Sequence, residues 1–280
     1  MMPHKLRPIT AADVPDAQVL TASFGWPHRR EDWAVMQSLG QGVVVEQGGR
    51  LAGTALCWRY GDDWATMGLI AVAEALQGQG MGRRMMLALM EGLESRSLAL
   101  HATRAGLKLY SAMGFQPTGT VVQHQGAVSQ PGLLPLPEGM RLRPVTRTDL
   151  PGLLALDRDA VGMDRTPLLT ALLQMPGGIA LARGGTLAGF ALVRRFGHGQ
   201  AIGPVIAPDP DGARAMIAHI LGQRTGQFMR IDIPKSCGLS PWLLNLGLDD
   251  AGTVIRMIRG SDVPVPRHAH AFALASQAFG

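Results

Sequence analysis

Short apolar runs separated by turn residues divide the first part of the chain into alternating strands and helices. Runs rich in Val, Leu, Ile and Ala have the length of strands, and the segments between them consist of helix-forming residues. A turn of Gln47, Gly48 and Gly49 joins two of the runs. Strands are predicted at 5–9, 42–46, 51–59, 64–72, 98–101 and 115–123, and helices at 13–22, 30–39, 83–91 and 105–113.

The chain repeats itself at a spacing of 136 residues. LRPITAADVP, starting at Leu6, matches LRPVTRTDLP, starting at Leu142, and GGRLAGTAL at Gly48 matches GGTLAGFAL at Gly184. Two independent matches at one offset indicate a duplicated domain. The second copy is predicted to contain strands at 141–144, 179–182, 186–195, 200–206, 227–233 and 253–259, helices at 148–159, 166–174, 211–222 and 241–246, and an apolar tail at 268–279 that can add a last strand.

A segment rich in Gly and Pro and poor in charge separates the two copies. Such a composition is typical of a linker. We therefore expect a first domain over residues 1–126, a linker over 127–139 and a second domain over 140–280.

A glycine-rich loop lies between a predicted strand and a predicted helix. It reads QGQGMG from Gln77 to Gly82 and is followed by Arg83 and Arg84. Backbone N–H groups at a helix start are unpaired, and the helix dipole adds partial positive charge there. Glycines let the backbone approach a phosphate closely. The loop is therefore a candidate site for an anion such as a phosphate.

The spacing of the glycines distinguishes between nucleotide-binding loops. Gly82 is not followed by Lys-Ser/Thr, which excludes a P-loop, and the sixth position from Gly78 is Arg83, which excludes a dinucleotide fingerprint. The loop fits Gln/Arg-x-x-Gly-x-Gly/Ala, with Gln77, Gly80 and Gly82 in the named places. In this it resembles the acyl-CoA pyrophosphate loop of the GNAT N-acetyltransferase superfamily.

A second segment strengthens the resemblance. Residues 98–115 read LALHATRAGLKLYSAMGF, a strand and a short helix before Gly-Phe opens another strand. Its Leu-Tyr-x-x-x-Gly-Phe pattern, centred on Tyr110, is similar to the second GNAT signature, which carries the general-acid tyrosine. The resemblance covers nearly the whole chain. It implies an α/β (α+β) fold of two GNAT-like domains in tandem, each a mixed, mostly antiparallel twisted sheet flanked by helices.

The resemblance also implies a direct transfer reaction. The co-substrate is acetyl-CoA, no metal is needed, and the acceptor is the amine of a small molecule. A backbone N–H near Ile70 polarises the thioester carbonyl, and Tyr110 protonates the departing thiolate. The implied residues for acetyl-CoA are Leu69, Ile70, Ala71, Val72, Gln77, Gly78, Gln79, Gly80, Met81, Gly82 and Arg83.

The general base and the acceptor pocket are less directly indicated. His101 ends a predicted strand near the cofactor opening, and the ordinary histidine pKa suits a base; the alternative is a structural histidine. Trp26 and His28 lie in a Gly/Pro loop of the kind that contacts substrate in this family. They are predicted to wall the amine pocket, with a hydrophobic plug under the loop as the alternative.

The second copy lacks both signatures. The positions aligned with the glycine loop read ARAMIA, residues 213–218, and the position aligned with Tyr110 is Leu243. The second domain therefore resembles a degenerate GNAT domain, and we expect one CoA per chain, with the second domain walling the acceptor side of the cleft.

Composition limits the choice of partners and compartment. The net charge is +5 and the pI is about 9.9, but no Lys/Arg cluster with interleaved aromatics indicates nucleic acid, and CoA is a sufficient anionic partner. The two cysteines do not form a disulfide framework, and no apolar run reaches bilayer length. We expect a cytoplasmic monomer or homodimer without membrane partners.

Three functions remain open from the sequence. The first is acetyl transfer to a small-molecule amine. The alternatives are a non-catalytic acyl-CoA-binding sensor and a protein lysine or N-terminal acetyltransferase. Retention of Tyr110 favours an enzyme, because a sensor needs no acid for a leaving thiolate.

Overall fold

A single twisted sheet runs through both halves of the chain in the computed structural model, which describes residues 4–132, 134–175, 177–262 and 268–280. The strands are β1 His4–Pro8, β2 Gln41–Gln47, β3 Arg50–Tyr60, β4 Trp64–Val72, β5 Ser97–Ala102, β6 Gln116–Ala127, β7 Met140–Pro144, β8 Gly178–Arg183, β9 Thr186–Phe196, β10 Gly199–Ala207, β11 Phe228–Pro234, β12 Asp249–Arg259 and β13 His270–Ala273. The helices are α1 Val14–Ala22, α2 Arg30–Leu39, α3 Met81–Met90, α4 Leu107–Ala112, α5 Leu150–Val161, α6 Thr166–Leu172, α7 Pro210–Gly222 and α8 Ser240–Asn245.

The sheet is mostly antiparallel, with one parallel pair in each half. The strand order is β1-β2-β3-β4-β5-β12-β6-β11-β10-β9-β8-β7, and β13 pairs with β10. The parallel pairs are β4 with β5 and β10 with β11. Both halves thus have the twisted, mostly antiparallel, helix-flanked sheet that was predicted, and each has one point where neighbouring parallel strands can separate.

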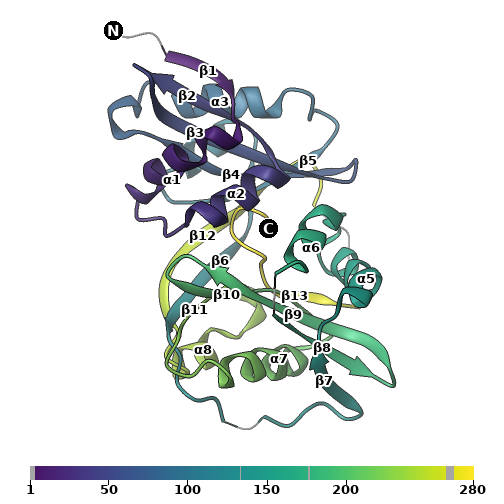
Figure 1. Cartoon of the computed structure of the whole chain (residues 1–280). Helices are drawn as coiled ribbons and strands as arrows, with labels where there is room; N and C mark the ends of the chain where they lie inside the picture. The colour runs from purple at the N-terminus through teal and green to yellow at the C-terminus, as the bar shows by residue number, and fades with distance from the viewer. Residues whose placement is uncertain (1–3, 133, 176, 263–267) are drawn as a thin grey trace.

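The two halves exchange strands where they meet. β12, from the second copy, lies between β5 and β6 of the first, and β6 in turn pairs with β11. Figure 1 shows the halves stacked, with β6 and β12 running between them and the end of the chain at their junction. β6 also continues past the predicted domain boundary to Ala127. The duplicated units therefore share one sheet.

Apolar side chains fill three clusters that follow this architecture. One lies under α3 and includes Met85, Met86 and Phe115; another lies under α7. The third joins the halves and includes Trp58 of β3 and Phe279 from the end of the chain. Burying side chains of this size contributes about 1.5–3 kcal/mol each, so this cluster helps to hold the two halves together.

Candidate active site

The parallel strands β4 and β5 separate part-way along their length. Their last paired residues are Met67 and Leu100. Beyond that point, residues 68–72 of β4 pair with β3 on one side and with no strand of the described chain on the other. A strand edge with free N–H and C=O groups can accept an extended ligand as an extra strand. This opening contains the predicted positions Leu69 to Val72.

A β-bulge marks the same stretch of β4. Leu56 pairs with Gly68 and Thr54 with Ala71, so Leu69 and Ile70 face one residue of β3. Leu69 adopts a left-handed conformation, with φ 53°, and its carbonyl accepts a 2.7 Å hydrogen bond from the buried Thr54 hydroxyl. Bulges re-aim backbone groups next to active sites. Sequence reasoning missed this bulge, because nothing in the apolar run distinguishes it from a regular strand.

The glycine loop leads from this edge into α3 and presents open backbone. Gly78 and Gly80 both have φ +74°, and a Cβ atom on either would meet nothing within 4 Å. Gly80 is the N-cap of α3, and no side chain caps the helix. Gln77 and Gln79 turn back onto the carbonyls of Val72 and Ala75. The α3 N-terminus therefore offers its amides to an anion, as the pyrophosphate of acetyl-CoA requires.

The other predicted members of the loop take different positions. Met81 is buried under α3, Gly82 sits in the first helical turn, and Arg83 is exposed beside the loop. A Cβ on Gly82 would lie 3.2 Å from Leu109 Cδ2, so this glycine allows α3 to pack closely on α4.

The corresponding opening in the second half is filled by the protein itself. β10 and β11 separate after Ile202 and Ile231, but β13 then pairs with β10 through Val205 to Ala207. These residues align with Leu69 to Ala71 in the repeat. The N-terminus of α7 is also occupied, because Asp209 accepts a 2.7 Å hydrogen bond from Gly212 N. Both parts of a CoA site are thus closed in this half.

Tyr110 is buried on the α3 side of the sheet. Its ring packs edge-on against Phe115, with centroids 6.2 Å apart, and a Cβ on Gly106 would lie 2.6 Å from the ring. Burial raises the pKa of Tyr110 to about 12, so the phenol stays protonated at neutral pH. Within the described residues, no group hydrogen-bonds its hydroxyl.

His101 lies on the opposite face, at the point where the strands separate. It follows Leu100, the last paired residue of β5, and side chains alternate between the faces of a strand. Its Nδ1 lies 2.8 Å from the carbonyl oxygen of Gln277, and its Nε2 is enclosed without a partner in the described chain. A carbonyl only accepts, so Nδ1 carries the proton and Nε2 presents a lone pair.

The protonation state of His101 follows from its surroundings. Burial lowers its pKa to about 4, against an opposing contribution from the hydrogen bond to Gln277. The nearby charge of Arg256 lowers the pKa further, and that of Asp232 raises it. The ring is therefore neutral at neutral pH and able to accept a proton at Nε2.

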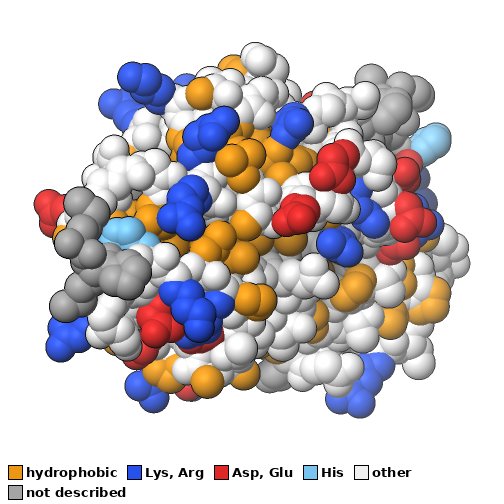
Figure 2. Space-filling model, turned by 90° about the horizontal axis from the view of Figure 1, so that it is seen from above, with side chains coloured by type: hydrophobic (Ala, Val, Ile, Leu, Met, Phe, Trp, Pro, Cys, Tyr) orange, Lys and Arg blue, Asp and Glu red, His pale blue; other side chains and the backbone are white. Residues whose placement is uncertain are grey.

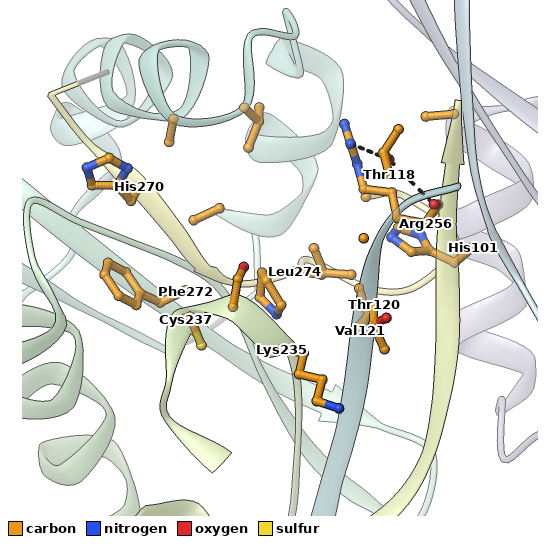
Figure 3. A pocket seen from close by; sticks show the side chains of 18 of the residues that line it. His101, Thr118, Thr120, Val121, Lys235, Cys237, Arg256, His270, Phe272 and Leu274 are labelled. Atoms are coloured by element: carbon orange, nitrogen blue, oxygen red, sulfur yellow. Dashed lines mark hydrogen bonds between the residues drawn. The ribbon is translucent and has the colours of Figure 1, made fainter. Parts of the chain in front are cut away.

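His101 lines a large cavity between the two halves, with a volume of about 1020 Å³. Its wall is mostly apolar and is contributed by both copies, from β5, β6 and β12 on one side and from α5 and β13 on the other. Figure 3 shows His101, Thr118 and Arg256 across the cavity from Phe272 and His270. Arg256 is held there by Thr118, at 2.9 Å, and by Asp262.

The predicted substrate residues Trp26 and His28 lie elsewhere. His28 packs edge-on against Phe196 of the second half, with centroids 5.3 Å apart, and Trp26 packs against His28. Burial, followed by the charge of Arg230, lowers the pKa of His28 to about 4. Neither residue lines the His101 cavity. Their position matches the alternative that this loop is an apolar contact, and their substrate role stays a prediction.

The end of the chain also contributes to the first half, which the sequence did not suggest. Residues 275–280 cross the face of β3, β4 and β5 on the His101 side. Phe279 packs on Trp58 with centroids 5.0 Å apart, and its carbonyl accepts from the Tyr60 hydroxyl at 3.2 Å. Because these contacts join residues some 200 positions apart, no local pattern indicates them.

Comparison with known proteins identifies the fold and the family. Two models described as "Acetyltransferase (GNAT) domain" match residues 38–117 and 153–273. The uncharacterized N-acetyltransferase YitH of Bacillus subtilis is 32% identical over 221 residues, which cover 77% of this chain and 76% of that protein. The chain belongs to the GNAT acetyltransferase family. A putative acetyltransferase from Pyrococcus horikoshii has the same fold, with a TM-score of 0.80 and 22% identity over 99% of this chain and 96% of its own.

The tandem arrangement is also found among solved structures. A tandem GNAT protein from the clavulanic acid biosynthesis pathway matches with a TM-score of 0.62 and 13% identity, over 94% of this chain and all of that one. The GNAT chain described here is therefore an acyltransferase with two GNAT domains in tandem, from a family that transfers acetyl groups from acetyl-CoA to amines.

Charged side chains of both signs are spread over the surface of this GNAT protein (Figure 2). Figure 2 shows Lys and Arg side chains distributed among acidic and uncharged groups over one face, without a single large basic patch. Among the described helices, none has the length and apolar character to cross a bilayer.

Proposed function

We propose that the first half transfers the acetyl group of acetyl-CoA to the amine of a small molecule by direct attack. The observation that carries this proposal is the contrast between the halves. Residues 68–72 and the amides of Gly78 to Gly82 are open in the first half, whereas β13 and Asp209 fill the equivalent places in the second. Only one half keeps the opening that acetyl-CoA needs.

In this proposal the pantetheine arm lies along the free edge of β4. The pyrophosphate binds the amides at the start of α3, with Arg83 beside it. The bulge at Leu69 and Ile70 turns a backbone N–H toward the thioester oxygen, where it stabilises negative charge as the amine attacks.

The two candidate proton-transfer groups support attack across the sheet. His101 lies where β4 and β5 separate, and Tyr110 belongs to the apolar cluster on the opposite face of the sheet. The amine nitrogen attacks the carbonyl carbon from the His101 side and loses a proton to His101 Nε2. The C–S bond then breaks, and the thiolate takes a proton from the Tyr110 hydroxyl on the other side.

The low pKa of His101 is compatible with this role. A ring with a pKa of about 4 does not remove a proton from a free ammonium group. The nitrogen of the attacking neutral amine becomes positively charged when it bonds to the thioester carbonyl carbon, and its N–H is then much more acidic. His101 is always neutral at that moment, so its lone pair is available.

The cavity favours a small molecule over a protein side chain. A volume of about 1020 Å³ is at the upper end for small-molecule sites, and an apolar wall with a few polar groups is typical of them. The wall carries Arg165, Lys235 and Arg256 beside Asp209 and Asp262, so it offers no excess of acidic groups to a cationic peptide.

The direct test is release of free CoA thiol from acetyl-CoA across a panel of amines. We expect turnover with small apolar-bodied amines and none with lysine-containing peptides. His101→Gln should lower kcat by about 10²-fold or more without weakening acetyl-CoA binding. Acetyl-CoA binding without turnover on any amine would instead indicate a sensor, and turnover on peptides alone would indicate a protein acetyltransferase.

A further inference from the structure

The hydrogen bond between His101 and Gln277 joins the candidate base of one half to the last segment of the other. The partners are 176 positions apart in the sequence. The Gln277 carbonyl oxygen lies 2.8 Å from His101 Nδ1, and the Gln277 side chain is itself held. Its amide donates to Gln123 Oε1 on β6 and to Asp232 Oδ1 on β11, both at 3.3 Å.

This contact decides which nitrogen of His101 carries the proton. With Nδ1–H bound to a carbonyl, the neutral ring has its lone pair on Nε2, which is enclosed in the protein and has no other partner in the described chain. The His101 residue itself lines the cavity. Without the carbonyl, a neutral imidazole exchanges between two tautomers, and the ring is free to rotate. A base in the wrong tautomer presents an N–H where a lone pair is required.

We propose that Gln277 is a positioning residue for His101, through which the degenerate half takes part in acetyl transfer by the first half. The Gln277 backbone carbonyl fixes the His101 tautomer and ring orientation. The Gln277 side chain, held by Gln123 and Asp232, keeps that carbonyl in place. The inference rests on the proposed role of His101 as the base.

Packing and hydrogen bonds fix the backbone around Gln277, which supports a stable contact between its carbonyl and His101. The next residue, Ala278, lies against Gly68 on β4, and Phe279 is almost fully buried against Trp58. On the other side Arg194 donates to the Ala275 carbonyl at 2.7 Å. The backbone after Gln277 is thus held by the first half, and the backbone before it is held by the second half.

Two charges act on His101, those of Arg256 and Asp232, and a third charged group lines the same cavity. Arg256 on β12 is paired with Asp262, and Asp232 on β11 is paired with Arg230 at 2.9 Å. Arg165, after α5, lines the same cavity and is paired with Asp157. A change at Gln277 removes one hydrogen bond to Asp232, while the contacts of Arg256 with Asp262 and of Arg165 with Asp157 do not involve Gln277.

The test replaces Gln277 by Met in the full chain, which keeps the length of the side chain and removes the amide. Gln223→Met, at the exposed C-terminal end of α7, is the matched control. Imidazole ¹⁵N and ¹³C NMR on histidine-labelled protein reports the tautomer, with the His101 signal assigned by its loss in His101→Gln. This readout needs no turnover, so it is independent of the proposed function.

We expect a pure Nδ1–H tautomer of His101 in the native chain and in Gln223→Met, and a mixture in Gln277→Met. The kcat of Gln277→Met should fall by roughly 10-fold, less than in His101→Gln, while the KM for acetyl-CoA stays unchanged. Gln123→Met, which removes one acceptor of the Gln277 amide, should give a smaller shift in the same direction and serves if Gln277→Met does not fold. An unchanged tautomer in both variants overturns the proposal, and so does a changed tautomer with unchanged kcat.

Discussion

Ala278, near the end of the second half, lies directly on Gly68 of β4 in the first. A Cβ atom placed on Gly68 would be 3.0 Å from Ala278 Cα and 3.1 Å from its Cβ. Gly68 is also the first residue of β4 beyond the last pair with β5. The opening between β4 and β5 therefore begins at the residue on which the end of the second half packs.

Gly68→Val should weaken the packing of Ala278 on β4. The added methyl groups collide with the Ala278 backbone and with Trp58, 3.2 Å from the Cβ position, and overpacking of this kind costs about 1–3 kcal/mol. We expect a lower free energy of unfolding in urea and a larger loss of acceptor turnover than of acetyl-CoA affinity. The control is Gly132→Val, where a Cβ meets nothing within 4 Å. Equal stability of the two variants would contradict this packing.

Gly80→Val should abolish CoA binding while the protein stays folded. A side chain at Gly80 would stand among the amides at the start of α3. Gly92→Val is the matched control, because Gly92 has a φ of +73° and equally open surroundings but follows the other end of α3. The strain should destabilise each variant by about 1–3 kcal/mol. Calorimetry that gives the two variants the same CoA affinity would refute the loop assignment.

Tyr110→Phe should lower kcat by about 10²-fold and leave the acetyl-CoA affinity unchanged. Its stability should barely change, since the hydroxyl has no described partner and the ring keeps its contact with Phe115. Tyr60→Phe provides the contrast: it removes a hydrogen bond to the buried Phe279 carbonyl and should cost about 1 kcal/mol. If Tyr110→Phe turned over as fast as the native enzyme at every pH, Tyr110 would be a packing residue.

Calorimetric titration should give one CoA per chain. In the second half β13 occupies the edge of β10, and Asp209 caps α7. Asp209→Ala should destabilise the protein by about 1 kcal/mol through loss of the cap, yet leave the stoichiometry at one, because β13 still fills the opening. A second CoA in either protein would show that this half has its own site.

Stability should fall as the pH drops from about 6.5 to about 4. Burial lowers the pKa values of His28 and His101 to about 4, below the ordinary value of 6.5, so in this range the unfolded chain binds protons that the folded chain does not. Urea unfolding should show a shallower pH dependence in His28→Phe and His101→Gln than in the native chain. His219→Gln, at an exposed site on α7, is the control variant. If the free energy of unfolding kept the native pH dependence in all three variants, His28 and His101 would not be its source.

The sequence by itself determined the repeated fold, and it predicts the cofactor part of the site from the glycine loop. Strand and helix periodicity depends on local residue order. The helix at 30–39 and the strand at 64–72 were therefore predicted with their observed bounds, and the other elements lie close to the predicted ranges. The two domain-model matches and the tandem neighbour confirm the duplication. Residues 213–218 contain no glycine, which indicated that the second half had lost the loop. In the structure, Asp209 caps the helix N-terminus of that half.

Only the tertiary structure decided how the halves complete one another. The insertion of β12 between β5 and β6 and the pairing of β13 with β10 join segments that are far apart in sequence. Strand pairing depends on backbone hydrogen bonds that any residue except proline can make, so side-chain patterns do not specify the partner. For the same reason, the link from Gln277 to His101 has no signature in the sequence. Its acceptor is a main-chain carbonyl, positioned by the packing of Ala278 and Phe279 on β3 and β4 together with the hydrogen bonds of the Gln277 amide.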